Sequence, residues 1–204
     1  MNLEHKQHGV LVKYQCLCAE DLNNVQDLAA KINYHRAKLA AQGPNYNGVM
    51  DTKTRRCWTS KSSEAASLDR ITRPLFEEYL STYGIHLSEK QQNDCFTENY
   101  IIKYKAEDVG FFDWHQDVID TDPPRVVSLS LMLNSQYTGG NFVFKHGQQE
   151  SEVDLCENSC VMFTPNIPHK VTPITSGSRY VVVSWLHCPV EYQISEHLSW
   201  VATN

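Results

Sequence analysis

Four side chains in the second half of the 204-residue chain could act together in one reaction: His115, Asp117, His169 and Arg179. The first two form a His-Gln-Asp motif. On an extended segment, residues two apart point to the same side, so both side chains can reach one metal ion. About half an HxD motif is expected by chance at this composition. Alone, the motif would therefore indicate a surface histidine and aspartate on a polar loop.

His169 could supply a third ligand. It lies 52 residues after Asp117, beyond the apolar run Cys160–Phe163 and a turn that contains two prolines. Two imidazoles and one carboxylate are the ligand set of the facial triad in non-haem iron(II) enzymes, which leaves coordination positions for substrate and O₂. Alone, His169 would be a turn histidine. Together with His115 and Asp117 it predicts a metal centre.

Arg179 opens an apolar strand, Tyr-Val-Val-Val-Ser-Trp, ten residues after His169. A guanidinium group binds a carboxylate through two parallel hydrogen bonds, which a lysine cannot do. This position favours recognition of a dicarboxylate next to the metal. The alternative is an arginine at the sheet edge in a surface ion pair.

The elements that position these residues change character near residue 95. Before it, residues 10–17 predict a short strand, and residues 21–41 a helix with one apolar face. A second helix is expected over residues 62–83, with a kink or break at Pro74. We expect residues 1–94 to be mainly helical support within a single domain, 1–204.

After Cys95 the pattern is that of short strands separated by turns. The expected strands are residues 98–104, 126–133, 141–144, 152–155, 160–163, 170–173 and 180–187. Strands at this spacing indicate a β-sandwich or barrel, including the jelly roll. Helices followed by strands predict an α+β fold, with the N-terminal helices packed on one face of a catalytic core over residues 95–190.

The ordered set of motifs in this half resembles the prolyl 4-hydroxylase branch of the 2-oxoglutarate oxygenases. The resemblance covers roughly residues 97–187, and the N-terminal helices carry no motif. Its segments are Ile101-Ile-Lys-Tyr104, Trp114-His-Gln-Asp117, the strand from Arg125 to Asn134, the Tyr137-Thr-Gly-Gly turn with Phe142-Val-Phe144, and Phe163 to Trp185.

The resemblance implies a double-stranded β-helix, or jelly roll, with iron(II) held by His115, Asp117 and His169. Arg179 would bind the C5 carboxylate of 2-oxoglutarate, and O₂ would be the second co-substrate, with ascorbate as a reductant. An aspartate in the triad favours hydroxylation, because halogenating relatives have a small residue at the position of Asp117.

The resemblance also implies roles around the metal. Tyr104 would be a further contact of the co-substrate, and Trp185, on the same strand face as Arg179, would lie near the substrate. Some relatives have a tyrosine near Met132, so that hydrogen bond would be missing here or be replaced. Arg125 could meet a substrate carboxylate at the mouth of the barrel, or form an ion pair instead.

The expected reaction is hydroxylation of an unactivated C–H bond in a prolyl residue of a protein or peptide. The alternatives are hydroxylation of a free amino acid or small metabolite, and a metal-binding cupin without catalysis. For a peptide substrate, we expect residues 105–113 to form a mobile loop that closes over it. For a metabolite, the same loop should pack down over a small enclosed cavity. The oligomeric state stays open.

Composition narrows the partners and the compartment. A net charge of −6 argues against nucleic acid as the main partner. No apolar run is long enough to span a membrane, and the polar N-terminus lacks the apolar stretch of a signal peptide. Seven irregularly spaced cysteines predict mostly buried, reduced thiols, which favours the cytoplasm.

Overall fold

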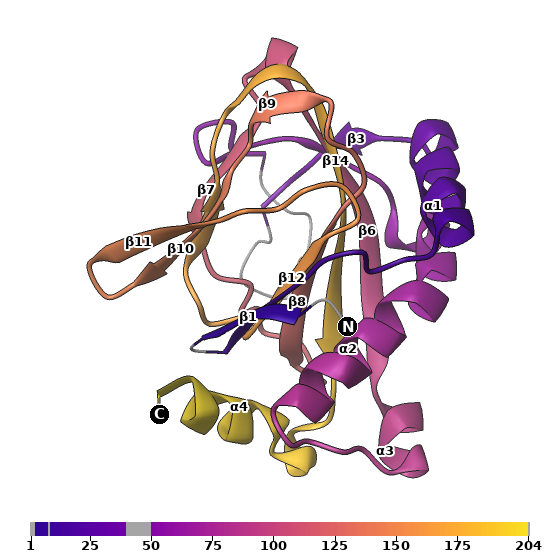
Figure 1. Cartoon of the computed structure of the whole chain (residues 1–204), viewed down its shortest axis with the longest axis vertical. Helices are drawn as coiled ribbons and strands as arrows, with labels where there is room; N and C mark the ends of the chain where they lie inside the picture. The colour runs from indigo at the N-terminus through magenta and orange to yellow at the C-terminus, as the bar shows by residue number, and fades with distance from the viewer. Residues whose placement is uncertain (1–2, 8, 40–49, 204) are drawn as a thin grey trace.

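The computed structural model describes residues 3–7, 9–39 and 50–203. Its strands form two antiparallel sheets (Figure 1). In spatial order, the larger sheet contains β1 (Leu3–Gln7), β2 (Val10–Lys13), β12 (Cys160–Phe163), β8 (Arg125–Met132), β14 (Ile174–His187), β6 (Phe96–Lys105), β5 (Trp58–Thr59) and β3 (His35–Arg36), with β9 (Tyr137–Gly139) paired to β14. The smaller sheet contains β11 (Gln149–Val153), β10 (Phe142–His146), β13 (His169–Val171), β7 (Phe111–His115) and β4 (Arg55–Arg56).

Both faces of the larger sheet are buried. Successive side chains of a strand point to opposite faces, so neighbouring residues belong to different hydrophobic clusters. Ile101 and Leu131 belong to an outer cluster that packs against the helices. Their neighbours Ile102 and Met132 belong to an inner cluster, together with residues of the smaller sheet such as Phe144. The strands that carry the predicted site therefore present every second residue to the space between the sheets.

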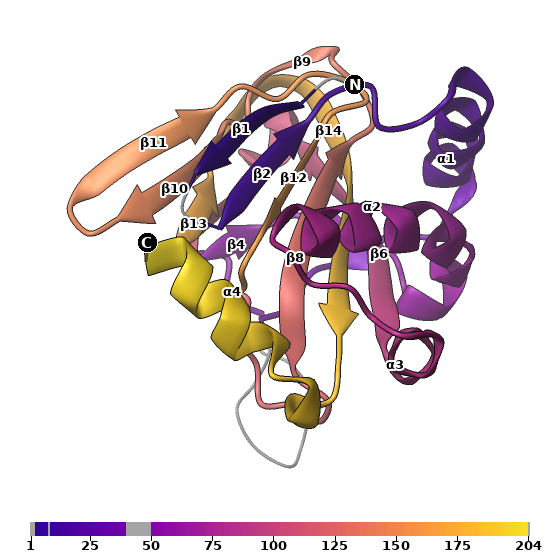
Figure 2. The ribbon, with the colours of Figure 1, turned by 60° about the horizontal axis from the view of Figure 1, so that its bottom comes forward.

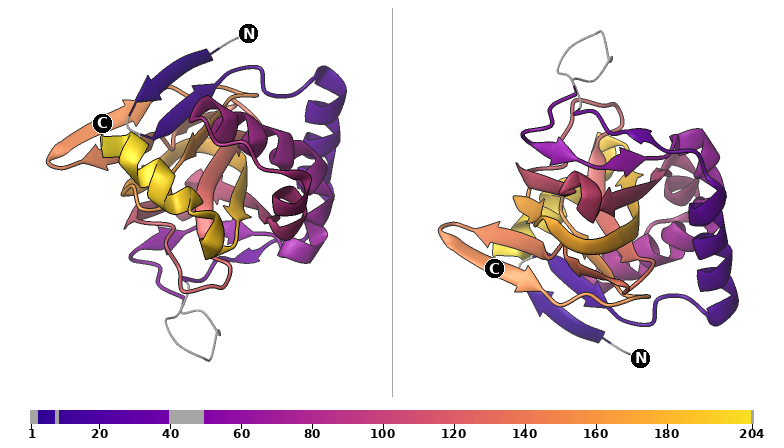
Figure 3. Two further views of the ribbon diagram at one scale, coloured as in Figure 1. Left: turned by 90° about the horizontal axis from the view of Figure 1, so that it is seen from below. Right: turned by 90° about the horizontal axis from the view of Figure 1, so that it is seen from above.

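Helices cover the outer face of the larger sheet, as the sequence predicted. Figure 2 shows α2 (Asp69–Thr82) and α4 (Ile194–Thr203) across this sheet, and the view from below in Figure 3 shows the same layer. The helix α1 (Ala19–Lys31) stands at the side, and α3 (Glu89–Asp94) leads into β6. The layer includes a C-terminal helix that the sequence pattern did not predict, with Leu198 buried in the outer cluster.

The two predicted helices differ from the observed ones at their ends. The helix expected over 21–41 ends at Lys31, because the chain then turns extended to form β3 against β5; its last two residues, 40–41, lie outside the described residues. Residues 62–68 form two 3₁₀ turns, and α2 begins only at Asp69. It continues past Pro74 without a break, because buried residues such as Phe76 hold it against the sheet and outweigh the missing hydrogen bond.

Residues 105–113 do not form the mobile loop expected for a peptide substrate; they pack down, as expected for a metabolite, although the cavity is not small. Ala106–Asp108 form one 3₁₀ turn, and β7 follows, paired to β13 on one side and to β4 on the other. The backbone of Gly110 donates to Lys105 O at 2.9 Å and accepts from Ile174 N at 2.9 Å. Because the backbone of this segment is paired on both sides, it is part of the smaller sheet and not a lid.

The N-terminal segment contributes strands as well as helices. The strand β2 pairs with β12 in the larger sheet, and the two-residue strands β4 and β5 extend the smaller and the larger sheet. Strands of two residues are too short to show an alternating pattern, so these strands could not be predicted from sequence.

The cysteines are only partly as predicted. Cys95 and Cys188 form a disulfide that joins the start of β6 to the end of β14. The other five are free thiols, but only Cys57 and Cys160 among them are buried. Within the described residues, no helix is both long and apolar enough to cross a bilayer.

Candidate metal centre and active site

The three predicted metal ligands converge. His115 and His169 are register partners on the neighbouring strands β7 and β13. Asp117 follows β7, and its backbone N–H donates to Pro165 O at 2.8 Å, which anchors it beside the pair. Nε2 of His115 lies 3.9 Å from one Asp117 oxygen, and Nε2 of His169 lies 3.7 Å from the other. One potential ligand atom from each residue lies within 4.8 Å of the others.

The backbone fixes which ring nitrogens face this centre. Nδ1 of His115 donates to Asp113 O at 2.7 Å, and Nδ1 of His169 donates to Ile167 O at 2.9 Å. Each Nε2 therefore carries the lone pair and points towards Asp117. The sequence could not identify these acceptors, because they are backbone carbonyls two residues before each histidine.

Burial and charge set the protonation of the centre. Burial, followed by the neighbouring His169, lowers the pKa of His115 to about 3, so its imidazole is neutral. Burial alone would raise the pKa of Asp117, but the two histidines outweigh it and hold the pKa below its ordinary value. Two imidazoles and one carboxylate form a donor set that fits a divalent iron ion.

Aromatic rings enclose both histidines. Phe112 stacks on His115 with ring centres 3.4 Å apart, and Phe142 stacks on His169 at 5.3 Å. These planar contacts restrict the rotation of the two imidazoles. They also remove water from one side of the centre, which strengthens electrostatic interactions inside it.

Arg179 shares a cavity of about 1650 Å³ with the three ligands. Its side chain is only 1% exposed. One Nη donates to Met132 Sδ at 3.2 Å, and Nε has no hydrogen-bond partner. Arg179 makes no ion pair with any residue that the structure describes. A buried guanidinium without an anionic partner is costly, so this position fits an acidic ligand.

Tyr104 lies beside Arg179, as the sequence predicted. The guanidinium carbon is 5.3 Å from the centre of the Tyr104 ring, and the tyrosine is 2% exposed. Burial raises the pKa of Tyr104 well above its ordinary value, so its hydroxyl stays protonated and can donate a hydrogen bond. Met132 lies next to Arg179 and offers it only a weak sulfur acceptor.

The Gly-Gly turn of the sequence makes room for Arg179. Gly140 has φ +68°, which L side chains rarely adopt. A Cβ atom there would lie 2.3 Å from Ile174 Cδ1 and 3.1 Å from Arg179 Cδ. The turn therefore needs glycine both for its backbone conformation and for the close approach of the arginine.

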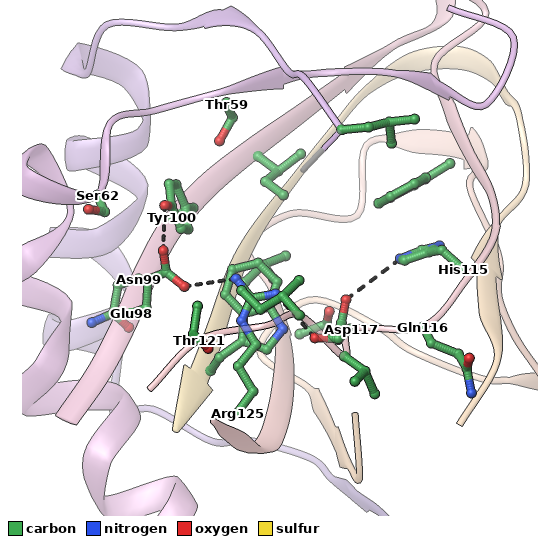
Figure 4. Close-up of a pocket in the computed structure, with 18 of the residues that line it drawn as sticks. Thr59, Ser62, Glu98, Asn99, Tyr100, His115, Gln116, Asp117, Thr121 and Arg125 are labelled. Atoms are coloured by element: carbon green, nitrogen blue, oxygen red, sulfur yellow. Dashed lines mark hydrogen bonds and ion pairs between the residues drawn. The ribbon is translucent and has the colours of Figure 1, made fainter. Parts of the chain in front are cut away.

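Trp185 and Arg125 line the same cavity (Figure 4 labels Arg125 beside Asp117). The Arg125 guanidinium lies 3.6 Å from the centre of the Trp185 ring. It donates to Glu98 Oε2 at 2.8 Å and to the backbone oxygen of Asp117 at 3.3 Å. Arg125 therefore forms an ion pair inside the cavity and supports the loop of a predicted metal ligand.

Sequence reasoning missed Glu98 and His187, which also line the cavity. His187 Nε2 lies 3.4 Å from Glu98 Oε2, and Tyr100 donates to the other Glu98 oxygen at 2.7 Å (Figure 4). Burial raises the pKa of Glu98, but hydrogen bonds from His187, Tyr100 and Arg125 outweigh it and lower the pKa to about 2. A signal existed, because Glu98 and Tyr100 alternate with outward residues on the strand that ends at Tyr104.

The relatives found by comparison with known proteins are hydroxylases and other oxygenases of one superfamily. Residues 100–187 match the family model described as the 2OG-Fe(II) oxygenase superfamily. A PKHD-type hydroxylase of Alteromonas mediterranea is 31% identical over 77 residues, which are 38% of this chain and 33% of that protein. A PKHD-type hydroxylase of Acinetobacter baumannii is 25% identical over 166 residues, which are 79% of this chain and 63% of that protein. The chain thus spans between a third and just under two thirds of these relatives.

Solved structures show the same fold. A prolyl hydroxylase of Trichoplax adhaerens, in complex with a peptide fragment of the hypoxia inducible factor oxygen degradation domain, superposes with a TM-score of 0.65 at 14% identity. The match covers 97% of this chain and 88% of that one. A prolyl-4-hydroxylase of Pseudomonas putida gives 0.61 at 17% identity, covering 89% and 93%. The predicted α+β fold with a jelly-roll core is confirmed.

The ligand set, the fold and the relatives agree, and the family implies Fe(II), 2-oxoglutarate and O₂ as cofactor and co-substrates. Over residues 100–187 the chain is therefore similar to the 2OG-Fe(II) oxygenase superfamily, and its fold resembles that of prolyl hydroxylases.

Proposed function

We propose that this protein hydroxylates prolyl residues in a protein or peptide. Fe(II) would be held by His115, Asp117 and His169, and the C5 carboxylate of 2-oxoglutarate by Arg179. The observation that carries the proposal is the position of Arg179, a buried guanidinium without an ionic partner among the described residues, in the cavity that also holds the three ligands.

Fe(II), 2-oxoglutarate and O₂, when bound, supply the oxidant that converts C–H to C–OH, with succinate and CO₂ as co-products. The chain supplies binding and orientation. Nε2 of His115 and of His169 would hold the metal, while Arg179 would fix the far carboxylate of the dicarboxylate. The ring of Tyr104 would form part of the wall of the co-substrate site beside Arg179, and the ring of Phe142 would exclude water.

The size of the cavity supports a peptide substrate. Its volume of about 1650 Å³ exceeds the roughly 300–1,000 Å³ of pockets for single small ligands. The cavity reaches the surface, because its lining includes Phe96, which is 46% exposed, and Val118, which is 62% exposed. These two apolar side chains could contact residues that flank the proline in an extended chain.

A second candidate, a free amino acid, is favoured by a different observation. Glu98 and Arg125 place opposite charges 2.8 Å apart inside the cavity. Such a pair could exchange its internal contact for the ammonium and carboxylate groups of an amino acid. The cost of separating a partly buried pair argues against this exchange.

The deciding experiment measures succinate formation with Fe(II), 2-oxoglutarate and ascorbate, using proline-containing peptides in one series and free amino acids in the other. We expect peptide-stimulated turnover and a gain of one oxygen atom on proline by mass spectrometry. The Arg179→Ala variant serves as a control that should be inactive at low 2-oxoglutarate. Turnover with free amino acids alone would reject the peptide proposal in favour of the second candidate.

A further inference from the structure

The seven arginines of the chain divide into two groups. Four form ion pairs with carboxylates: Arg36 with Asp108, Arg70 with Asp21, Arg73 with Asp69 and Arg125 with Glu98. Arg55, Arg56 and Arg179 form none with the described residues. Arg55 and Arg179 both line the cavity of the metal centre, whereas Arg56 is not part of its lining.

Arg55 reaches the metal centre through a stack of side chains. It lies on β4, directly opposite Phe112 of β7. Its guanidinium carbon is 4.5 Å from the centre of the Phe112 ring, and this ring stacks on His115 at 3.4 Å. A cation is thus held one aromatic ring away from a predicted metal ligand, at the edge of the smaller sheet.

The contacts of Arg55 leave its charge without a counterion. Nε donates to Cys57 Sγ at 3.1 Å, and one Nη donates to Lys38 O at 3.3 Å. Neither acceptor is ionised, since burial raises the pKa of the Cys57 thiol. Residues 40–49, which are not described, contain no aspartate or glutamate in their sequence.

The charges around the metal balance without Arg55, if the proposed function is correct. Two positive charges of Fe(II) and one of Arg179 match the carboxylate of Asp117 and the two carboxylates of 2-oxoglutarate. Glu98 and Arg125 neutralise each other. Arg55 lines the same cavity and adds one further positive charge, which interacts with Asp117 at a distance but forms no ion pair with it.

We propose that Arg55 binds an anionic group, a carboxylate or a phosphate, on the molecule that is hydroxylated. The inference rests on the proposed function and adds a substrate class to it. Nε and one Nη of Arg55 are already used, so the second Nη is the group that can donate charge-assisted hydrogen bonds to such an oxyanion. The anion would come from an acidic or phosphorylated residue beside the target, or from the carboxylate of a free amino acid.

The first test measures anion binding without turnover. Protein is loaded with Mn(II) and saturating 2-oxoglutarate under anaerobic conditions, and inorganic phosphate is titrated at constant ionic strength by calorimetry. We expect saturable binding in the unmodified protein, at least about tenfold weaker binding in Arg55→Gln, and partial retention in Arg55→Lys. Arg56→Gln is the matched control, since Arg56 lies on the same short strand over Phe111 and outside the cavity; its binding should be unchanged.

Absence of saturable phosphate binding, or equal binding in Arg55→Gln, would overturn the proposal. Loss of 2-oxoglutarate binding in Arg55→Gln would overturn it as well, because the arginine would then belong to the co-substrate. The loading step tests the proposed function separately: 2-oxoglutarate should raise the melting temperature of the Mn(II) protein but not of Arg179→Ala. If the unmodified protein fails this step, the co-substrate assignment fails. Phosphate titration of the Mn(II) protein alone, comparing Arg55→Gln with Arg179→Ala, then decides the role of Arg55.

The second test identifies the source of the anion. Succinate formation is compared for matched pairs: proline peptides with aspartate or asparagine next to proline, with phosphoserine or serine, and L-proline against L-prolinamide. We expect one anionic member to be preferred, and Arg55→Gln to reduce its kcat/KM about tenfold or more while changing its neutral partner less than twofold. An equal loss for both members of each pair would show that Arg55 is structural.

Discussion

His115 and His169 face each other as paired residues of β7 and β13, with ring centres 4.1 Å apart. Fifty-four positions separate them in the sequence, yet the antiparallel register makes them neighbours. Asp117 completes the centre only because the chain leaves β7 directly after His115. The geometry of the metal site is therefore a property of strand register, which a sheet with one buried face specifies strongly.

Removal of the carboxylate tests this centre. We expect Asp117→Asn to lower Mn(II) affinity by about a hundredfold, because a charged ligand is replaced by a neutral one while side-chain shape is kept. Calorimetric titration of metal-free protein measures the change. Asp113→Asn is the control, since the Asp113 side chain accepts only from the backbone of Trp114. Equal affinities for the two variants would show that Asp117 is not a ligand.

Replacement of Arg179 tests the co-substrate site. We expect Arg179→Ala to raise the KM for 2-oxoglutarate about ten- to a hundredfold, which corresponds to roughly 1.5–3 kcal/mol for a charge-assisted contact. Mn(II) affinity should stay nearly unchanged, because Arg179 contacts none of the three ligands. Steady-state kinetics and metal titration separate the two effects. An unchanged KM would make the arginine structural.

A glycine substitution tests whether the turn positions that arginine. Gly140→Ala should lower the free energy of unfolding by about 1–3 kcal/mol and raise the KM for 2-oxoglutarate, because its Cβ atom would displace Ile174 and Arg179. Gly147→Ala is the matched control: its φ is +60°, but nothing lies within 4 Å of the added Cβ. Backbone strain alone would affect both variants in the same way, and KM should rise only in the first.

Acid titration tests the ion pair in the cavity. The pKa of Glu98 is lowered from 4.5 to about 2 in the folded protein, so the unfolded chain takes up its proton first as pH falls. The contribution of Glu98 to stability is therefore complete above pH 4.5 and decreases as pH falls towards 2. Denaturant unfolding of the unmodified protein and Glu98→Gln at several pH values should show a difference that shrinks below pH 4.5. A difference independent of pH would contradict this assignment.

The sequence predicted best those strands whose apolar residues follow a periodic pattern. The strand Cys160–Phe163 matches the expected bounds, β6 and β14 contain the expected segments, and β8 ends one residue before the expected end at 133. Long strands with alternating burial can be predicted from the alternation of apolar and polar residues. By contrast, the first residues of β7 fell in the segment expected as a loop for a peptide substrate, because this strand is stabilised by hydrogen bonds to β13 and β4, two segments far away in sequence.

The candidate site shows the same division. His115, Asp117 and His169 could be found because each lies in a motif beside a recognisable strand. Arg55 could not be found, since its two-residue strand carries no periodicity and only the fold brings it to the metal centre. Arg125 and Glu98 lie on the two strands that flank β14, so their ion pair could not be predicted from the sequence either.

A proposed metal ligand and the arginine proposed to bind the co-substrate lie on different sheets. His169 belongs to the smaller sheet, and Arg179 to the larger one. A single diacid bound between the metal and Arg179 would connect the two sheets, so its binding free energy would oppose their separation. Amide hydrogen exchange should therefore slow in β13 and β14 together when 2-oxoglutarate joins the metal-loaded protein, and with Arg179→Ala it should slow in neither. The concentration of 2-oxoglutarate would therefore determine how rigidly the two sheets are held together.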